Sequence, residues 1–85
     1  MDQADLTAVR IFLETLLREH DDVAPFGDAE SLIKTGRLDS LSVVKLVTFL
    51  ESDFAVDFTK VEFDPERFDS VSEIAAILED ARRLA

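Results

Sequence analysis

The stretch Leu32–Phe54, LIKTGRLDSLSVVKLVTFLESDF, carries the strongest structural signal in this chain. From Leu41 onward its apolar residues cover most of the circumference of a helix. This pattern predicts a helix that begins at Asp39 or Ser40 and reaches about Asp53. A helix this apolar is expected to be the most enclosed element of the fold. The polar residues that align along it form one narrow stripe, namely Ser42, Lys45, Thr48 and Ser52.

Helical periodicity also marks both ends of the chain. A first helix is expected from about Asp5 to Glu19, and Arg18 and His20 fall near its end, where positive charge suits the helix dipole. Its apolar stripe comprises Leu6, Val9, Phe12, Leu13, Leu16 and Leu17. A last helix opens at Ser70–Glu73, which has the spacing of a capping box. Its expected buried face comprises Val71, Ile74, Ile77, Leu78, Ala81 and Leu84.

The connections between these helices differ in character. Residues 21–38 form a long loop with Pro25, Gly27 and Gly36, and a loop of this length in a small domain is often functional. The segment Ala55–Phe63 is expected to be a linker whose Phe residues plug the core, in preference to a short edge strand. Asp64–Phe68 predicts a one-turn helix, with Asp64 as its cap and Pro65 at its first position.

The composition favours a single all-α domain over residues 1–85. A chain of 85 residues makes one small domain, and 47% hydrophobic residues suit an efficient core. Two Gly and two Pro argue against a turn-rich β fold. The chain has no Cys, which excludes a disulfide framework and any thiol chemistry of the protein's own. No metal-loop pattern is present, so a metal site is not expected.

The formal net charge of −10 limits the classes of partner. It argues against nucleic acid and against anionic membrane surfaces, because like charges would repel. It fits a soluble monomer that meets basic protein partners, although many domains are acidic without such partners. The acidic start Met1–Asp5 does not resemble a signal peptide, and no apolar run is long enough for a membrane span. A cytoplasmic protein is therefore expected.

The stretch Gly36-Arg37-Leu38-Asp39-Ser40-Leu41 is the candidate functional motif. An Asp-Ser-Leu tripeptide alone is a weak signal, because Asp and Ser are favoured helix caps. Here it ends a long loop, follows a Gly-x-Leu step and opens the most apolar helix of the chain. A phosphodiester on Ser40 would lie at a helix N-terminus, where free N–H groups and the helix dipole favour an anion.

With this context the chain resembles the acyl carrier protein family, and Leu50-Glu51-x-x-Phe54 and Phe68-x-x-Val71 extend the match. The resemblance implies a small four-helix bundle with three main helices, a short third helix and a long first loop. It implies that 4′-phosphopantetheine from coenzyme A is attached to Ser40 and that its thiol carries an acyl or aminoacyl thioester. It also implies that a phosphopantetheinyl transferase reads Asp39 and Leu41. For Leu41 a second role, as the first core residue of its helix, is equally open, and the two roles are compatible.

The expected function is that of a free-standing acyl carrier protein. It would receive acyl groups from a loading ligase or transferase and deliver them to downstream acyl-processing enzymes. The alternative is an aminoacyl carrier, of D-alanyl or peptidyl type, loaded by an adenylating ligase; Arg37-Leu38-Asp39-Ser40 follows the acyl and D-alanyl style. A more remote alternative is a non-carrier acidic adaptor, in which Ser40 is only a cap.

An enzyme is not expected. His20 with Asp39 and Ser40 supplies the residue types of a hydrolase triad, but nothing in the sequence suggests an oxyanion hole. A bundle this small also has little room for a substrate pocket.

Two features distinguish this chain within the family it resembles. Fatty-acid carriers usually have acidic residues at the start of the second helix, where this chain has Ser42 and Lys45. Its acidic residues lie in the loops instead, namely Asp21, Asp22, Asp28, Glu30, Asp57, Glu62, Asp64, Glu66 and Asp69. We therefore expect a specialised carrier. Five aromatic residues could line a cleft for an acyl chain, although core packing is favoured: Phe49, Phe54, Phe58, Phe63 and Phe68.

Overall fold

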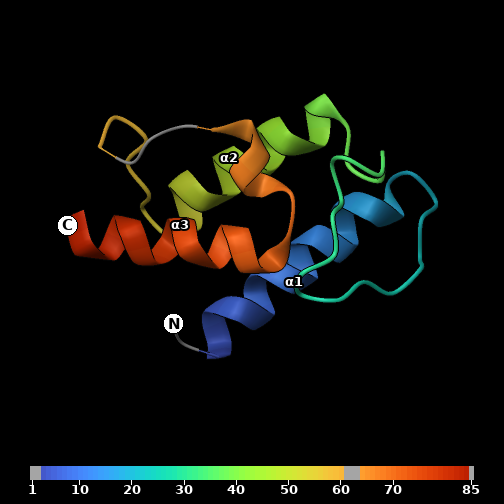
Figure 1. Ribbon diagram of the computed structural model, residues 1–85, viewed down its shortest axis with the longest axis horizontal. Coiled ribbons are helices and arrows are strands. Elements are labelled where there is room, and N and C mark those ends of the chain that lie inside the picture. Colours follow the sequence, from blue (N-terminus) through green and yellow to red (C-terminus); the bar gives the residue numbers. More distant parts are fainter. Residues whose placement is uncertain (1–2, 61–63, 85) are drawn as a thin grey trace.

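The computed structural model describes residues 3–60 and 64–84, and every regular element in these ranges is a helix. The elements are α1 (Gln3–Arg18), α2 (Ser40–Asp53), the 3-10 helix η1 (Pro65–Phe68) and α3 (Val71–Leu84), as Figure 1 shows. The predicted all-α class is therefore confirmed. The first helix begins two residues before the expected Asp5, at Gln3, and ends one residue before the expected Glu19, at Arg18. The second helix has the predicted bounds.

One cluster of buried apolar side chains forms the core. The α1 side contributes Val9, Leu13, Leu16 and Leu17, and the α3 side contributes Val71, Ile74, Ile77 and Leu78. Phe68 of η1 and Leu32, Leu38 and Phe26 of the long loop complete the cluster with Leu46, Leu50 and Val56. Removal of these side chains from water is the main favourable contribution to folding.

The prediction that α2 is the most enclosed helix is wrong. Its fully buried residues are Ser42, Leu46 and Leu50, whereas the side chains of Leu41 and Val44 are 62% and 60% exposed. The physical reason is the arrangement of neighbours: α2 packs against α1, while α3 packs against α1 and η1. One flank of the most apolar helix is therefore left uncovered.

The caps of the two later helices form as predicted. The Asp64 carboxylate accepts a hydrogen bond from the Glu66 N–H at 3.1 Å, and Pro65 opens η1. The Ser70 hydroxyl accepts from the Glu73 N–H at 3.2 Å at the start of α3. These contacts are local, so the sequence pattern identifies them without knowledge of the tertiary fold.

The segment after α2 is a linker over residues 55–60, with a turn closed by the Lys60 N–H and the Asp57 carbonyl. The expected Phe packing is confirmed for the described residues. Phe54 and Phe58 pack on the core, the Phe58 and Phe68 ring centroids are 6.0 Å apart, and Phe68 is fully buried. The expectation for Phe63 concerns a position outside the described residues.

Candidate functional site

Ser40 is the first residue of α2 and is exposed to solvent. Asp39 is the N-cap, with extended backbone angles (φ −94°, ψ 179°), and its Oδ1 accepts from the Ser42 N–H at 2.8 Å. Leu38 on the loop side is buried, whereas Leu41 on the helix side is exposed, so the interpretation of Leu41 as the first core residue of its helix is wrong. Ser40 therefore stands between an apolar anchor in the core and an apolar side chain at the surface.

The N-terminus of α2 keeps free hydrogen-bond donors beside Ser40. The helical ladder starts with the Val43 N–H, which donates to the Asp39 carbonyl at 3.1 Å. Among the described residues, the N–H groups of Ser40 and Leu41 have no hydrogen-bond partner. The hydrogen bond from the Ser42 backbone is the largest cause that lowers the pKa of Asp39, so this cap is ionised at neutral pH.

His20 reaches this junction from beyond the end of α1. Its Nε2 lies 3.3 Å from the Ser42 Oγ and 3.4 Å from the Asp39 Oδ2. The expectation for His20 was a place at the helix end, and that position is confirmed, but the contact with the α2 cap was not predicted. No spacing in the sequence could reveal it, because it arises from the packing of α1 against α2.

The cluster of His20, Asp39 and Ser42 does not have the geometry of a hydrolase triad. In a triad the carboxylate binds one imidazole nitrogen and the nucleophile binds the other. Here Asp39 and Ser42 both approach Nε2, and Ser42 is only 2% exposed. The contacts instead tie the end of α1 to the start of α2.

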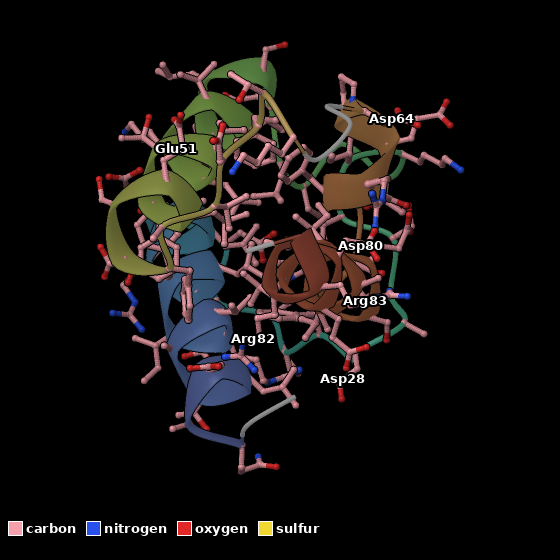
Figure 2. All side chains as sticks on the ribbon, turned by 90° about the vertical axis from the view of Figure 1, so that its left-hand side faces the viewer. Asp28, Glu51, Asp64, Asp80, Arg82 and Arg83 are labelled. Carbon is pink, nitrogen blue, oxygen red and sulfur yellow. The ribbon has the colours of Figure 1, made fainter. Side chains whose placement is uncertain are left out.

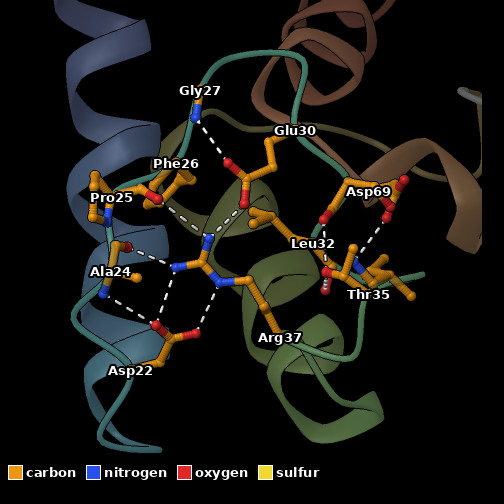
Figure 3. Close-up of polar contacts among 12 residues, drawn as sticks. Asp22, Ala24, Pro25, Phe26, Gly27, Glu30, Leu32, Thr35, Arg37 and Asp69 are labelled. Carbon is orange, nitrogen blue, oxygen red and sulfur yellow. Dashed lines mark hydrogen bonds and ion pairs between the residues drawn. The ribbon is translucent and has the colours of Figure 1, made fainter.

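Arg37 ties the end of the long loop to its beginning (Figure 3). Its guanidinium holds both carboxylate oxygens of Asp22, at 2.8 and 3.1 Å, and one oxygen of Glu30 at 2.6 Å. It also donates to the carbonyls of Ala24, at 2.6 Å, and Pro25, at 3.4 Å. The hydrogen bond from Arg37 lowers the pKa of Asp22, and the same bond raises the pKa of Arg37.

The acidity of this loop is partly neutralised within the fold. Asp22 and Glu30 pair with Arg37, and Asp28 pairs with Arg10. Of the four acidic residues in the loop before Ser40, three therefore form ion pairs within the fold. The sequence indicated their number and position, but not that two Arg side chains would bind them.

Asp69 anchors the middle of the loop to the start of α3 (Figure 3). Its carbonyl accepts from the Leu32 N–H at 2.7 Å, and its Oδ1 accepts from the N–H groups of Ile33 at 2.7 Å and Lys34 at 3.1 Å. Asp69 is only 4% exposed. Burial raises its pKa, but the hydrogen bonds and the charge of Lys34 outweigh burial, so that its pKa is lowered.

Gly36 forms a turn in the last part of the loop before Ser40. Its N–H closes a turn on the Ile33 carbonyl at 3.0 Å, and its φ of +83° lies in the region that favours glycine. The Leu38 N–H then donates to the Leu32 carbonyl at 2.9 Å. The backbone is thus fixed directly before Asp39 and Ser40.

Replacing Arg37 by Lys is expected to release the loop while the helices persist. Lysine carries a point charge and cannot reproduce the forked contacts with Asp22, Glu30 and two carbonyls. We expect amide hydrogen exchange to accelerate over residues 21–38. The matched control is Arg83→Lys, because Arg83 is exposed and pairs only with Asp80 among the described ion pairs. Unchanged exchange in the Arg37 variant would contradict the assigned role.

Replacing Asp69 by Asn is expected to remove part of the acid sensitivity of the fold. Since the folded-state pKa is lowered from 3.8, Asp69 stabilises the protein above that value, and this stabilisation is lost as the pH falls through the folded-state pKa. Asparagine keeps the acceptor oxygen but not the charge, which should cost about 1–2 kcal/mol at pH 7. Urea denaturation should show that the difference in free energy of unfolding between the two proteins disappears below about pH 4. A difference in free energy of unfolding that stays constant with pH would contradict the prediction.

The comparisons with known proteins agree with the resemblance to carrier proteins. A D-alanyl carrier protein of Lacticaseibacillus rhamnosus is 40% identical over 52 residues, which cover 61% of this chain and 64% of that protein. A D-alanyl carrier protein of Lacticaseibacillus casei (strain BL23) is 38% identical over 52 residues, with the same coverage. These two relatives support a carrier protein family for this chain.

The extent of these matches is limited. The chain spans slightly less than two thirds of the length of the curated relatives it matches. No family model matches the sequence, and no solved structure matches it. Within residues 3–60 and 64–84, no helix is long and apolar enough to cross a membrane. The same residues contain no group of three or more side chains suited to hold a metal ion.

Proposed function

We propose that residues 1–85 form one carrier domain of the acyl carrier bundle type, which holds acyl groups as thioesters on 4′-phosphopantetheine attached to Ser40. The main support for this proposal is the exposure of Ser40 at the capped N-terminus of α2. Ser40 directly follows a loop that Arg37 and Asp69 hold in place. A fixed backbone presents the hydroxyl in one position, which a modifying enzyme requires.

The residues around Ser40 fit the proposed group. The unpartnered N–H groups of Ser40 and Leu41 favour an anion such as a phosphodiester. Asp39 holds the first turn of the helix, and the exposed Leu41 offers an apolar contact to a phosphopantetheinyl transferase. When attached, the group supplies a thiol, which this chain lacks because it contains no Cys.

This proposal assigns a non-catalytic role to the chain. Its partners would be the transferase, a loading ligase or acyltransferase, and downstream acyl-processing enzymes, met as a monomer in the cytoplasm. The acidic chain, with a net charge of −10, suits encounter with basic surfaces on such enzymes. His20, which binds Asp39, would position the first turn of α2 and would not take part in chemistry.

An aminoacyl cargo is the second candidate. The observation that favours it is the similarity to two D-alanyl carrier proteins. In that case a ligase that activates an amino acid as an adenylate would load the thiol. The same similarity gives less support to a role in fatty-acid or polyketide biosynthesis.

The test is to incubate the protein with coenzyme A and a broad-specificity phosphopantetheinyl transferase, and to measure the intact mass. We expect a gain of one phosphopantetheinyl group, and peptide mapping should place it on Ser40 among the six serines. Absence of any gain would favour the acidic adaptor. Subsequent incubation with an amino acid, ATP and an adenylating ligase, or with an acyl donor and an acyltransferase, separates the two cargo classes by mass.

A further inference from the structure

The imidazole of His20 contacts both residues that close the first turn of α2. Its Nε2 lies 3.4 Å from the Asp39 Oδ2 and 3.3 Å from the Ser42 Oγ. Between these two residues the chain contains only Ser40 and Leu41. The Asp39 Oδ1 accepts from the Ser42 N–H at 2.8 Å, so the cap closes the turn and the ring of His20 braces it from outside. His20 therefore contacts the residues on either side of the proposed attachment position.

The Asp39 carboxylate is held by donors from two segments of the chain. The hydrogen bonds from the Ser42 backbone and hydroxyl are the largest causes that lower the pKa of Asp39, and the charge of His20 acts in the same direction. Since an ionised carboxylate only accepts hydrogen bonds, the contact with His20 requires a proton on Nε2. Each carboxylate oxygen therefore has its own donor, with Oδ1 held by Ser42 and Oδ2 by His20.

The Asp39 carboxylate is held in place and is still accessible. The side chains of His20 and Asp39 are 45% and 52% exposed, and a shallow pocket opens beside them. The rest of the pocket lining comes from the long loop, namely Asp22, Thr35, Gly36 and Arg37. Arg37 binds Asp22 and Glu30 and leaves Asp39 to its contacts with His20 and Ser42. An exposed side chain ordinarily samples several rotamers, whereas the contacts of Asp39 favour one.

Two adjacent residues connect the end of α1 to the start of α2. Figure 2 shows these two helices together on one flank of the molecule and α3 on the other. The Glu19 carboxylate lies 3.1 Å from the Lys45 Nζ, and His20 contacts the cap. The Glu19–Lys45 pair thus connects the same two elements as His20 without contact with Asp39. It offers a means to separate the hold on the cap from the general link between the helices.

We propose that His20 is a positioning residue for the modification of Ser40, because it fixes the Asp39 carboxylate in the orientation that a phosphopantetheinyl transferase binds. The proposal rests on the proposed carrier function and extends it to a residue outside the Gly36–Leu41 motif. A cap that is ordered before binding does not have to be ordered during binding, so the transferase binds more tightly. His20 itself does not react.

The kinetic test measures the rate of modification by intact mass over a series of apo-protein concentrations. His20→Phe keeps an aromatic ring and removes the hydrogen-bond donor. We expect the KM for the apo-protein to rise about three- to tenfold, the cost of ordering one side chain, while kcat stays within about twofold. His20→Gln returns an N–H donor at the distance of Nε2 along the side chain. It should restore most of the original KM.

A double variant tests whether His20 acts through Asp39. Asp39→Ser keeps a favourable cap and removes the oxygen that His20 contacts. When His20→Phe is added to Asp39→Ser, kcat/KM should fall by less than about twofold, because coupled residues are not additive. The matched control combines Glu19→Gln with Lys45→Gln. This pair of changes removes the other contact between the two elements and leaves the net charge unchanged, so KM should stay within about twofold.

An NMR measurement tests the positioning without a transferase. Three-bond couplings to the Asp39 Cγ report its χ1 angle. We expect a single rotamer in the unmodified protein and in His20→Gln, and an average over rotamers in His20→Phe. Circular dichroism verifies that each variant is folded, and the partial exposure of His20 implies only a small change in stability.

Four results would overturn the proposal. They are an unchanged KM in His20→Phe, a fall in kcat alone, an equal rise of KM in the Glu19 and Lys45 control, and Asp39 couplings that do not change in His20→Phe. If the original protein gains no phosphopantetheinyl mass at all, the carrier function itself fails. The Asp39 couplings are measured separately, so the two failures are distinguishable.

Discussion

Replacing Ser40 by Ala is expected to abolish phosphopantetheine attachment completely while the helical fold persists. In the transfer, the Ser40 Oγ would lose its proton and bond to the phosphorus next to the pantetheine arm of coenzyme A, while the pyrophosphate bond breaks and adenosine 3′,5′-bisphosphate leaves. Alanine has no hydroxyl to form this bond. The side chain is exposed, and the cap of α2 uses the Asp39 carboxylate and the Ser42 N–H, not the Ser40 hydroxyl. The change in folding free energy should therefore stay within about 0.5 kcal/mol.

The matched control for this experiment is Ser52→Ala. Ser52 is an exposed serine of the same helix, one residue before its end, and its replacement should leave the loading of Ser40 intact. Intact mass after incubation with coenzyme A and the transferase provides the measurement, and far-ultraviolet circular dichroism checks the fold. A full mass gain in the Ser40 variant would refute the assigned attachment site.

Replacing Leu46 by Ala is expected to cost about 2–5 kcal/mol of folding free energy, because it leaves a cavity in the core. Leu46 is 0% exposed and lies on the face of α2 that meets the core cluster. A domain of this size has a total stability of about 4–13 kcal/mol. The variant should therefore be close to unfolding, which urea denaturation followed by circular dichroism would show.

Leu41→Ala removes the same atoms from the same helix and serves as the matched control. Because Leu41 is 62% exposed, its replacement should change the folding free energy by about 0.5 kcal/mol or less. The sequence pattern treats the two residues as members of one apolar set. Equal costs at both positions would contradict the finding that one flank of α2 is open.

The elements that could be predicted from the sequence depend on neighbouring residues. The start of α2 at Ser40, the Asp64 cap of η1 and the Ser70 cap of α3 each rest on hydrogen bonds that span two or three residues. The apolar repeats of α1 and α3 identify their buried faces in the same way. These features can be predicted from the sequence because both hydrogen-bond partners lie within a few residues of each other.

The contacts that hold the site could not be predicted in this way. His20 meets Asp39 from another helix, and Asp69 binds the Ile33 N–H from 36 positions away. The forked contacts of Arg37 with Asp22 and Glu30 likewise require the path of the loop to be known. Many acidic residues in the sequence are equivalent as candidates for these contacts, and only their positions in the fold distinguish them.

The sequence by itself determined the four helical segments, the long first loop, the place of Ser40 at a helix N-terminus and the absence of a thiol. The tertiary structure decided that α2 is partly exposed and not fully enclosed. The physical reason is that a helix start depends on hydrogen bonds within one turn, whereas burial of a helix face depends on which distant segments cover it. In this fold α1 covers one side of α2, α3 packs elsewhere, and Leu41 and Val44 are left in solvent.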